Sequence, residues 1–227
     1  AGTGNNTQAF SAAYAGYRER ADERLAPVVA LERSAGMMAR GREKGVDARW
    51  VRADATALPL GKGSMDFIFG VCVIHHIRDL TRLFCECYRV LRDGGVVAVV
   101  TSPHDYIKNH PMNAYFPSFA RIDAARFQPI SEVLDALNDA GFSNGEAYRD
   151  IAAPSPIDTG YAHRVAGKYL STFALIPPEE LEAGLKRLYN DLARNGGVLD
   201  GHIAWEPVTV AGRKTQSHPT QQLELST

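Results

Sequence analysis

The stretch from Met65 to Ser102 constrains this chain more than any other part of the sequence. It opens with an apolar run, Phe67 to Ile74, which does not alternate with polar residues and therefore predicts a strand covered on both faces. Apolar residues at helical spacing then predict an amphipathic helix that ends at Gly94-Gly95: Leu80, Leu83, Phe84, Cys87, Val90 and Leu91. A second buried strand follows at Val96 to Val100. Strand, helix and strand in this order predict a right-handed crossover in an open α/β sheet.

Composition limits the class of protein and its partners. With 227 residues the chain fits one domain with a small subdomain. Its 25 basic and 26 acidic residues are well mixed, which argues against a nucleic-acid partner. No apolar run approaches the roughly 20 residues that cross a bilayer, so no membrane partner is expected. The three cysteines lack the spacing of a metal site, and buried, reduced thiols would suit the cytoplasm.

A glycine loop and an acidic strand end point to a nucleotide-like ligand. Gly2 and Gly4 precede a helix predicted for residues 7–25, and glycine there lets the backbone approach a ligand closely. A short buried strand, Val28 to Leu31, ends in Glu32. In nucleotide-binding α/β sheets such an acid accepts hydrogen bonds from two ribose hydroxyls. The alternative is that Glu32 is an ordinary charged loop residue.

Several segments closely resemble class I S-adenosylmethionine-dependent methyltransferases of type 11. They are Asp66-Phe67, the pair His75-His76, Arg89 to Gly95, and the segment from Asp54 to Leu60. The resemblance covers roughly residues 1–150. It implies an open, mostly parallel Rossmann-like α/β sheet and S-adenosylmethionine as cofactor. It also implies the residues that would bind this cofactor: Gly2, Thr3 and Gly4 in the loop, Glu32 at the ribose, Asp54 and Ala55 at the adenine, and Gly70 and Val71 at the methionine end.

The start of the chain resembles the second half of the family's first motif. In that motif an apolar strand precedes the glycine loop, whereas here the loop follows Ala1 directly. We therefore expect the first strand of the sheet to be absent from this chain. A native tail of small residues is the alternative.

The chain is expected to divide into four parts. Residues 1–151 form the cofactor-binding core, 152–197 an inserted helical cap, 198–212 the last strand of the core, and 213–227 a disordered tail. The cap has no counterpart in a minimal methyltransferase. It is either a lid over the substrate or an added packing surface, which could serve a homodimer.

The acceptor pocket is expected where the loop from His104 to Phe119 and the helix from Tyr161 to Tyr169 approach His75-His76. Aromatic and histidine side chains favour a small, partly apolar molecule held by a few polar anchors. We therefore expect methylation of a small molecule at oxygen, nitrogen or carbon. His76 is the first candidate for a general base and His163 the second. Positioning alone is the alternative mechanism.

Two other functions stay open. A nicotinamide-dependent oxidoreductase would carry a third glycine where Thr7 stands, so the sequence disfavours it. A non-catalytic protein that binds S-adenosylmethionine, or a scaffold, is the other alternative. Titration with S-adenosylmethionine and with NAD distinguishes these two functions from that of a methyltransferase.

Overall fold

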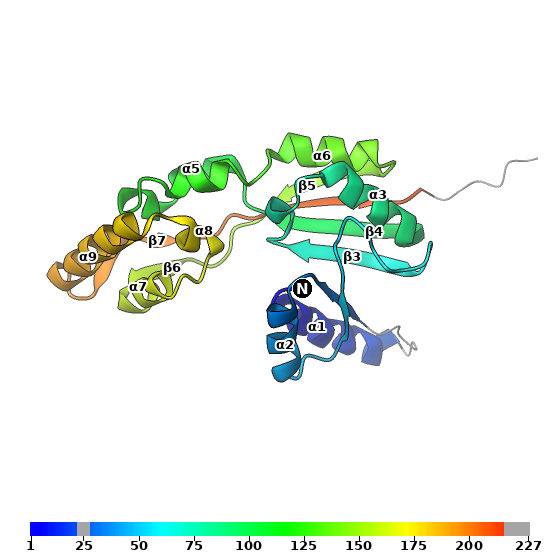
Figure 1. The fold of residues 1–227 in the computed structure, drawn as a ribbon, viewed down its shortest axis with the longest axis horizontal. Coiled ribbons are helices and arrows are strands. Elements are labelled where there is room, and N and C mark those ends of the chain that lie inside the picture. Colours follow the sequence, from blue (N-terminus) through cyan, green and yellow to red (C-terminus); the bar gives the residue numbers. More distant parts are fainter. Residues whose placement is uncertain (22–27, 216–227) are drawn as a thin grey trace, which may run out of the picture.

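A four-stranded sheet forms the centre of the computed structural model, which describes residues 1–21 and 28–215 (Figure 1). The strand order is β3-β4-β8-β5, with bounds Met65–Val71, Leu91–Thr101, Val208–Arg213 and Ser143–Arg149. β3 pairs with β4 in parallel, whereas β8 runs antiparallel to both β4 and β5. Three of these four strands thus share one direction. The predicted class, a mostly parallel α/β sheet, is confirmed.

The predicted crossover is present, but its elements end earlier than expected. The strand β3 stops at Val71 because Cys72 takes a left-handed backbone conformation, with φ of 50°. The helix α3, Leu80–Val90, ends before Leu91, which is fully buried and extended. Gly94 has φ of 81° and lies within β4, so the glycine pair bends the strand and does not end the helix.

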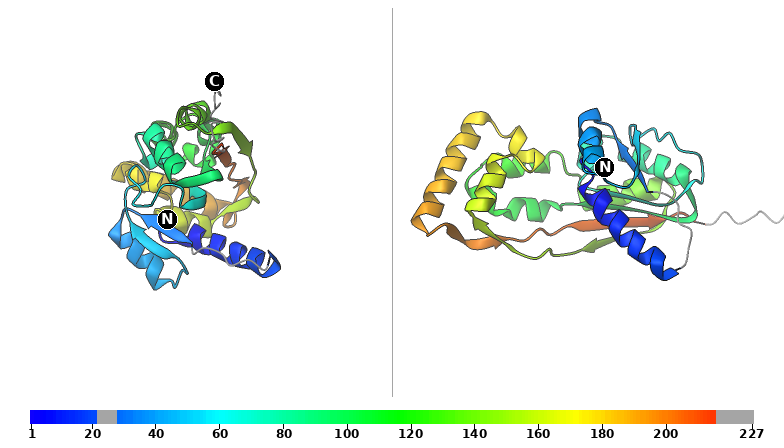
Figure 2. Two further views of the ribbon diagram at one scale, coloured as in Figure 1. Left: turned by 90° about the vertical axis from the view of Figure 1, so that its right-hand side faces the viewer. Right: turned by 90° about the horizontal axis from the view of Figure 1, so that it is seen from below.

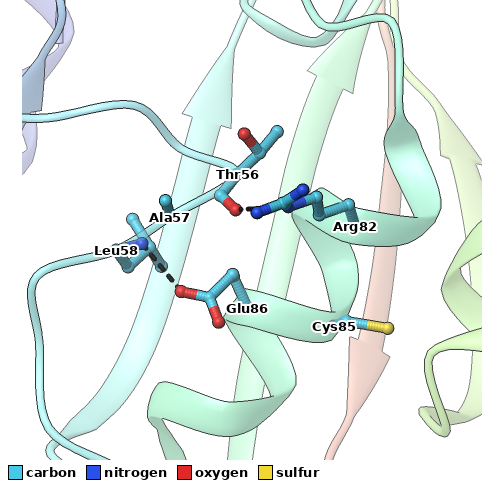
Figure 3. Close-up of a pocket in the computed structure, with 6 residues that line it drawn as sticks. All are labelled: Thr56, Ala57, Leu58, Arg82, Cys85 and Glu86. Atoms are coloured by element: carbon cyan, nitrogen blue, oxygen red, sulfur yellow. Dashed lines mark hydrogen bonds between the residues drawn. The ribbon is translucent and has the colours of Figure 1, made fainter.

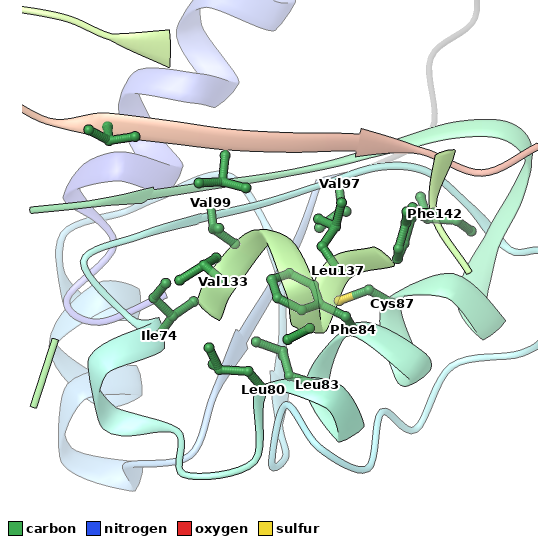
Figure 4. Packing of buried hydrophobic residues seen from close by; sticks show 14 residues of the cluster. Ile74, Leu80, Leu83, Phe84, Cys87, Val97, Val99, Val133, Leu137 and Phe142 are labelled. Carbon is green, nitrogen blue, oxygen red and sulfur yellow. The ribbon is translucent and has the colours of Figure 1, made fainter. Parts of the chain in front are cut away.

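The main core lies between the central sheet and two helices on one face. These are α3 and α6, Ile130–Asp139. Figure 4 shows Leu83 and Phe84 of α3 and Leu137 of α6 gathered beneath Val97 of β4. Pro129 precedes α6, and Ser131 lies inside its first turn. Both helices are held by apolar packing on one stripe, as their periodicity predicts.

A second, two-stranded sheet carries the amino-terminal part. β1, Val29–Glu32, pairs in parallel with β2, Arg49–Arg52. α1, Asn5–Ala21, and α2, Ala35–Glu43, belong to this part, and Ser34 caps α2 as its side chain accepts from the Met37 amide at 3.3 Å. The predicted end of α1 near residue 25 lies outside the described residues. Phe10 of α1 stacks near Phe67 and Phe69 of β3 and joins the two sheets.

The cap is larger than expected and has a core of its own (Figure 2). It contains α4 His104–Asn109, η2 Pro111–Ala114, α5 Phe119–Ala124, β6 Ser155–Asp158, α7 Thr159–Ala166, α8 Ser171–Leu175, α9 Pro178–Arg194 and β7 Val198–Ile203. Met112, Phe116 and Phe119 are buried against α7 and α9 residues in this core. The loop from His104 to Phe119 is therefore helical and is part of the cap. Gly184 of α9 leaves the space that Phe116 fills, because a Cβ atom there would lie 2.3 Å from the ring.

Three expected boundaries need correction. The strand expected over 198–212 is two strands, because β7 pairs antiparallel with β6 in the cap and only β8 joins the central sheet. The helix expected from Tyr161 to Tyr169 ends at Ala166, since Lys168 takes φ of 54°. The tail does not begin at 213, because Lys214 is buried and donates to the carbonyls of Tyr88 and Leu91. Residues 216–227 lie outside the described part.

Among the described residues, no helix combines the length and the apolar character that crossing a bilayer requires.

Phe84 provides a test of the core. It is fully buried in α3, so replacement by Ala should lower the free energy of unfolding by about 3–5 kcal/mol. Cys85, its exposed neighbour on the same helix, is the matched control, and its replacement by Ala should change stability by less than about 0.5 kcal/mol. Chemical denaturation measures both. Equal effects at the two positions would contradict this packing.

Candidate functional site

The carboxylate of Glu32 lies against the amino-terminal glycine loop, as the sequence suggested. One oxygen accepts from the amide of Gly2 at 2.7 Å, and the other accepts from the amide of Ser34 at 2.8 Å. Burial raises the pKa of Glu32, but the amides of Ser34 and Gly2 and the charged amino group of Ala1 outweigh it, so the pKa is lowered overall. The carboxylate is thus ionised at neutral pH. The amino group of Ala1 also donates to the oxygen that accepts from Gly2, at 3.2 Å, so the oxygen that accepts from Ser34 is the one that retains a lone pair for a further donor.

Asp54 stands at the end of the neighbouring strand. The backbone joins the two strand ends, because the amide of Ala53 donates to the carbonyl of Glu32 at 3.2 Å. One carboxylate oxygen of Asp54 accepts from the amide and the hydroxyl of Thr56, at 2.9 and 2.8 Å. These bonds lower the pKa of Asp54. Its other oxygen lies 3.7 Å from the exposed guanidinium of Arg33 and faces solvent, free to accept from a ligand.

Trp50 of β2 holds the glycine loop in place. A Cβ atom on Gly4 would lie 2.9 Å from Val46 and 3.3 Å from the Trp50 ring, and Gly4 has φ of 82°. Gly41 of α2 meets the same ring, since a Cβ atom there would lie 2.2 Å from it. By contrast, Gly2 has open space where a side chain would be. Gly4 is therefore explained by packing, while open space lies beside Gly2, whose amide donates to Glu32.

The remaining loop residue of the predicted set, Thr3, faces α2. Its hydroxyl accepts from the ammonium of Lys44 at 3.0 Å, and the side chain of Asn5 accepts from the same ammonium at 2.6 Å. A lysine thus anchors the loop from one side and Trp50 anchors it from the other. Binding of a cofactor by Thr3 stays a prediction.

Gly70 and Val71 lie at the end of β3, opposite Val99 and Val100 of β4. A Cβ atom on Gly70 would lie 2.8 Å from a methyl group of Val73, because the chain turns back over the strand at Cys72. Packing therefore already requires glycine at this position. Contact of Gly70 and Val71 with the cofactor stays a prediction, as does that of Ala55, which packs partly buried against the main core.

The two histidines differ in their surroundings. Both lie in the short helix η1, Ile74–His76, with ring centroids 4.1 Å apart. His75 stacks on Phe127 at 4.1 Å, and burial, together with His76 and Arg126, lowers its pKa to about 3. His76 is exposed, and its pKa is lowered by partial burial and by Arg126 and Arg33, while Glu32 opposes the shift. The lowered pKa makes His76 neutral at pH 7.

His163 lies on the exposed side of α7, and its role as the second candidate base stays a prediction. Its neighbours Tyr161, Ala162 and Val165 occupy the buried face of α7, so the helical period turns His163 outward. Its ring centroid lies 5.9 Å from that of Tyr189 on α9. Within the described residues, its only ring partner therefore belongs to the cap.

Sequence reasoning missed a set of charged residues on α3 that holds the loop after Asp54. Glu86 accepts from the amide of Leu58 at 2.7 Å, and Arg89 donates to the carbonyls of Leu58 and Leu60, each at 2.9 Å. Arg82 donates to the carbonyl of Thr56 at 3.1 Å. Figure 3 shows Arg82 and Glu86 reaching this loop across an open hollow of about 320 Å³. The sequence signal for this set was the spacing of Arg82, Glu86 and Arg89, which are four and three residues apart and therefore share one helix face.

The described residues contain no group of three or more His, Cys, Asp and Glu side chains suited to a metal ion. The candidate site thus consists of carboxylate acceptors at the ends of two parallel strands, with the backbone of the glycine loop beside them. Such a set can bind hydroxyl and amine donors of a nucleoside.

Comparison with known proteins assigns this arrangement to a family. Residues 1–99 match the family model described as a methyltransferase domain. Malonyl-(acyl-carrier protein) O-methyltransferase of Pectobacterium atrosepticum is 31% identical over 113 residues, which cover 48% of this chain and 42% of that protein. Demethylmenaquinone methyltransferase of Renibacterium salmoninarum is 26% identical over 125 residues, which cover 55% of this chain and 48% of that protein. The chain thus spans less than half the length of these curated relatives.

A solved structure extends the likeness to nearly the whole fold. A candidate methyltransferase from an antibiotic biosynthesis pathway of Anabaena variabilis matches with a TM-score of 0.62 and 22% identity, over 92% of this chain and 86% of that chain. This likeness concerns the fold alone. Residues 1–99 thus match the methyltransferase domain family, and the fold resembles that of the Anabaena protein.

Two glycines of α2 test the support of the glycine loop by Trp50. Gly41→Ala should lower the free energy of unfolding by about 1–3 kcal/mol, because the new methyl group overlaps the Trp50 ring. Gly36→Ala in the same helix meets open space and should raise it by up to about 1 kcal/mol. Urea denaturation measures the free energy of unfolding of both variants. A stabilising Gly41→Ala would show that this contact does not exist.

Proposed function

We propose that this protein binds S-adenosylmethionine at the ends of β1, β2 and β3 and transfers its methyl group to a small-molecule acceptor. The observation that carries the proposal is the convergence of Gly2, Glu32 and Asp54 at adjoining strand ends, within a domain of the methyltransferase family. The acceptor is a small molecule that is methylated at oxygen, nitrogen or carbon.

The residues present fit this cofactor. Glu32 is ionised, and its oxygen that accepts from Ser34 has a lone pair left for a ribose hydroxyl, while Asp54 has one oxygen left for the exocyclic amine of adenine. The open space at Gly2 leaves room for the ligand beside the loop. When bound, the cofactor supplies an electrophilic methyl group on a sulfonium. The protein's task is then to orient the acceptor and to exclude water.

The cap supports a small acceptor. Figure 1 shows it beyond the end toward which β3 points, where ligands bind in open α/β sheets. It carries a hydrogen-bonded pair, the exposed Tyr169 and the buried Tyr161, with 3.2 Å between the hydroxyls. The names of related proteins mention malonyl-(acyl-carrier protein), demethylmenaquinone and phosphoethanolamine as methyl acceptors. This diversity supports a small or carrier-bound molecule as the acceptor, without favouring any of these three compounds. The three free cysteines support a reducing compartment such as the cytoplasm.

Calorimetric titration tests the proposal. S-adenosylmethionine should bind and NAD should not, and incubation with methyl-labelled cofactor and a metabolite extract should label a small molecule. Binding without transfer would favour the non-catalytic alternative. Binding of NAD alone would overturn the assignment.

Glu32→Ala should weaken the binding of S-adenosylmethionine by about ten- to a hundredfold, because a carboxylate bonded to hydroxyls contributes roughly 1.5–3 kcal/mol. Glu32→Gln keeps one acceptor oxygen, so its loss should be smaller. Glu43→Ala is the control, because Glu43 is exposed and its side chain makes no hydrogen bond among the described residues. Unchanged affinity in a folded Glu32→Ala variant would remove Glu32 from the site.

His76 provides a pH test of the mechanism. A base acts when deprotonated, and the pKa of His76 lies below its ordinary 6.5, so turnover should be maximal at neutral pH and fall as the pH drops through that lowered pKa. His76→Gln should lower turnover and remove this acid limb. His202→Gln, on the exposed surface of β7, should leave the profile as it is. A wild-type profile in His76→Gln would leave positioning as the mechanism.

A further inference from the structure

The polar face of α3 controls the loop that carries Asp54. This loop, residues 53–64, contains neither helix nor strand, so its conformation depends on what binds its backbone groups. α3 provides three side chains for it: Arg82, Glu86 and Arg89. Glu86 and Arg89 also pair with each other at 2.7 Å and hold the part from Leu58 to Leu60.

Arg82 differs from the other two because it contacts the partner of Asp54. The guanidinium Nε donates to the carbonyl of Thr56, and the amide and hydroxyl of the same Thr56 donate to one oxygen of Asp54. Two consecutive contacts thus connect the helix to the carboxylate. Figure 3 shows Arg82 reaching from α3 to the Thr56 backbone, while the Thr56 hydroxyl points away from it.

This connection decides which oxygen of Asp54 is available. Thr56 occupies one oxygen with two donors, so the carboxylate cannot rotate without losing both bonds. The other oxygen is then held toward the open side, where Arg33 is the one cation of the described residues that approaches, at 3.7 Å. A carboxylate oxygen held in one orientation favours a ligand that presents a hydrogen-bond donor to it. A ligand that presents an acceptor binds more weakly, because neither acceptor then has a hydrogen-bond partner.

We propose that Arg82 is a positioning residue that holds Asp54, through Thr56, so that the site selects a 6-aminopurine over a 6-oxopurine in the cofactor. The inference rests on the proposed function, because it requires that Asp54 meets the adenine amine. Arg82 does not touch the cofactor itself. Its effect is therefore on the choice between cofactors more than on the stability of the fold.

The test compares two ligands, S-adenosylhomocysteine and its deaminated form S-inosylhomocysteine, by calorimetry on the full chain. The wild-type protein should prefer the adenosyl form by at least about tenfold. Arg82→Met should weaken the adenosyl form by roughly three- to tenfold and leave the inosyl form unchanged, so that the preference shrinks. Arg78→Met is the matched control, because the Arg78 side chain makes no hydrogen bond or ion pair within the described part of the chain, and it should keep the wild-type preference.

Thr56→Val tests the same connection without altering α3. It removes the hydroxyl donor to Asp54 and keeps the backbone amide, so the preference should fall by a smaller factor. Equal weakening of both ligands in Arg82→Met would mean a merely structural role and would overturn the proposal, as would an unchanged preference in both variants. If the wild-type protein binds neither ligand, the proposed function itself fails, which is a distinct result.

Discussion

The burial of one face of α3 against the central sheet is the interaction on which the rest of the structure depends. Leu83, Phe84 and Val90 are buried, and they fix the helix across β4. The opposite face is thereby set as well, because the two faces belong to one rigid helix. That second face presents Arg82, Glu86 and Arg89 to the loop after Asp54. One helix thus connects the apolar core with the position of a carboxylate at the candidate cofactor site.

The amino-terminal side of the site depends on close packing around an aromatic ring. Trp50 leaves no room for a side chain at Gly4 or Gly41, so the loop lies directly on β2. Glu32 then binds the loop by accepting from the amide of Gly2. Interiors with this packing density tolerate little change in volume, which explains why glycine is needed at Gly41, away from the strand ends.

The cap shows where reasoning from local patterns was insufficient. The segment from His104 to Phe119 looks irregular, with scattered aromatics and prolines, but Phe116 and Phe119 complete a core with residues of α7 and α9. Short helices of this kind have little intrinsic stability and form because tertiary contacts support them. The strand β7 illustrates the same point, because three helices separate it in the sequence from its partner β6. Ser155 of β6 nevertheless pairs with Ile203 of β7.

The sequence by itself determined the crossover, the acidic ends of β1 and β2 and the glycine loop, because each depends on periodicity or residue type within a short stretch. It also predicted that the two adjacent histidines follow the end of a strand. Only the tertiary structure decided that His75 stacks on Phe127, that the His163 ring lies beside Tyr189 of α9, and that Arg82 reaches Thr56. These relations join segments that are distant in the chain, and side-chain direction across such distances follows from packing, which no local pattern contains.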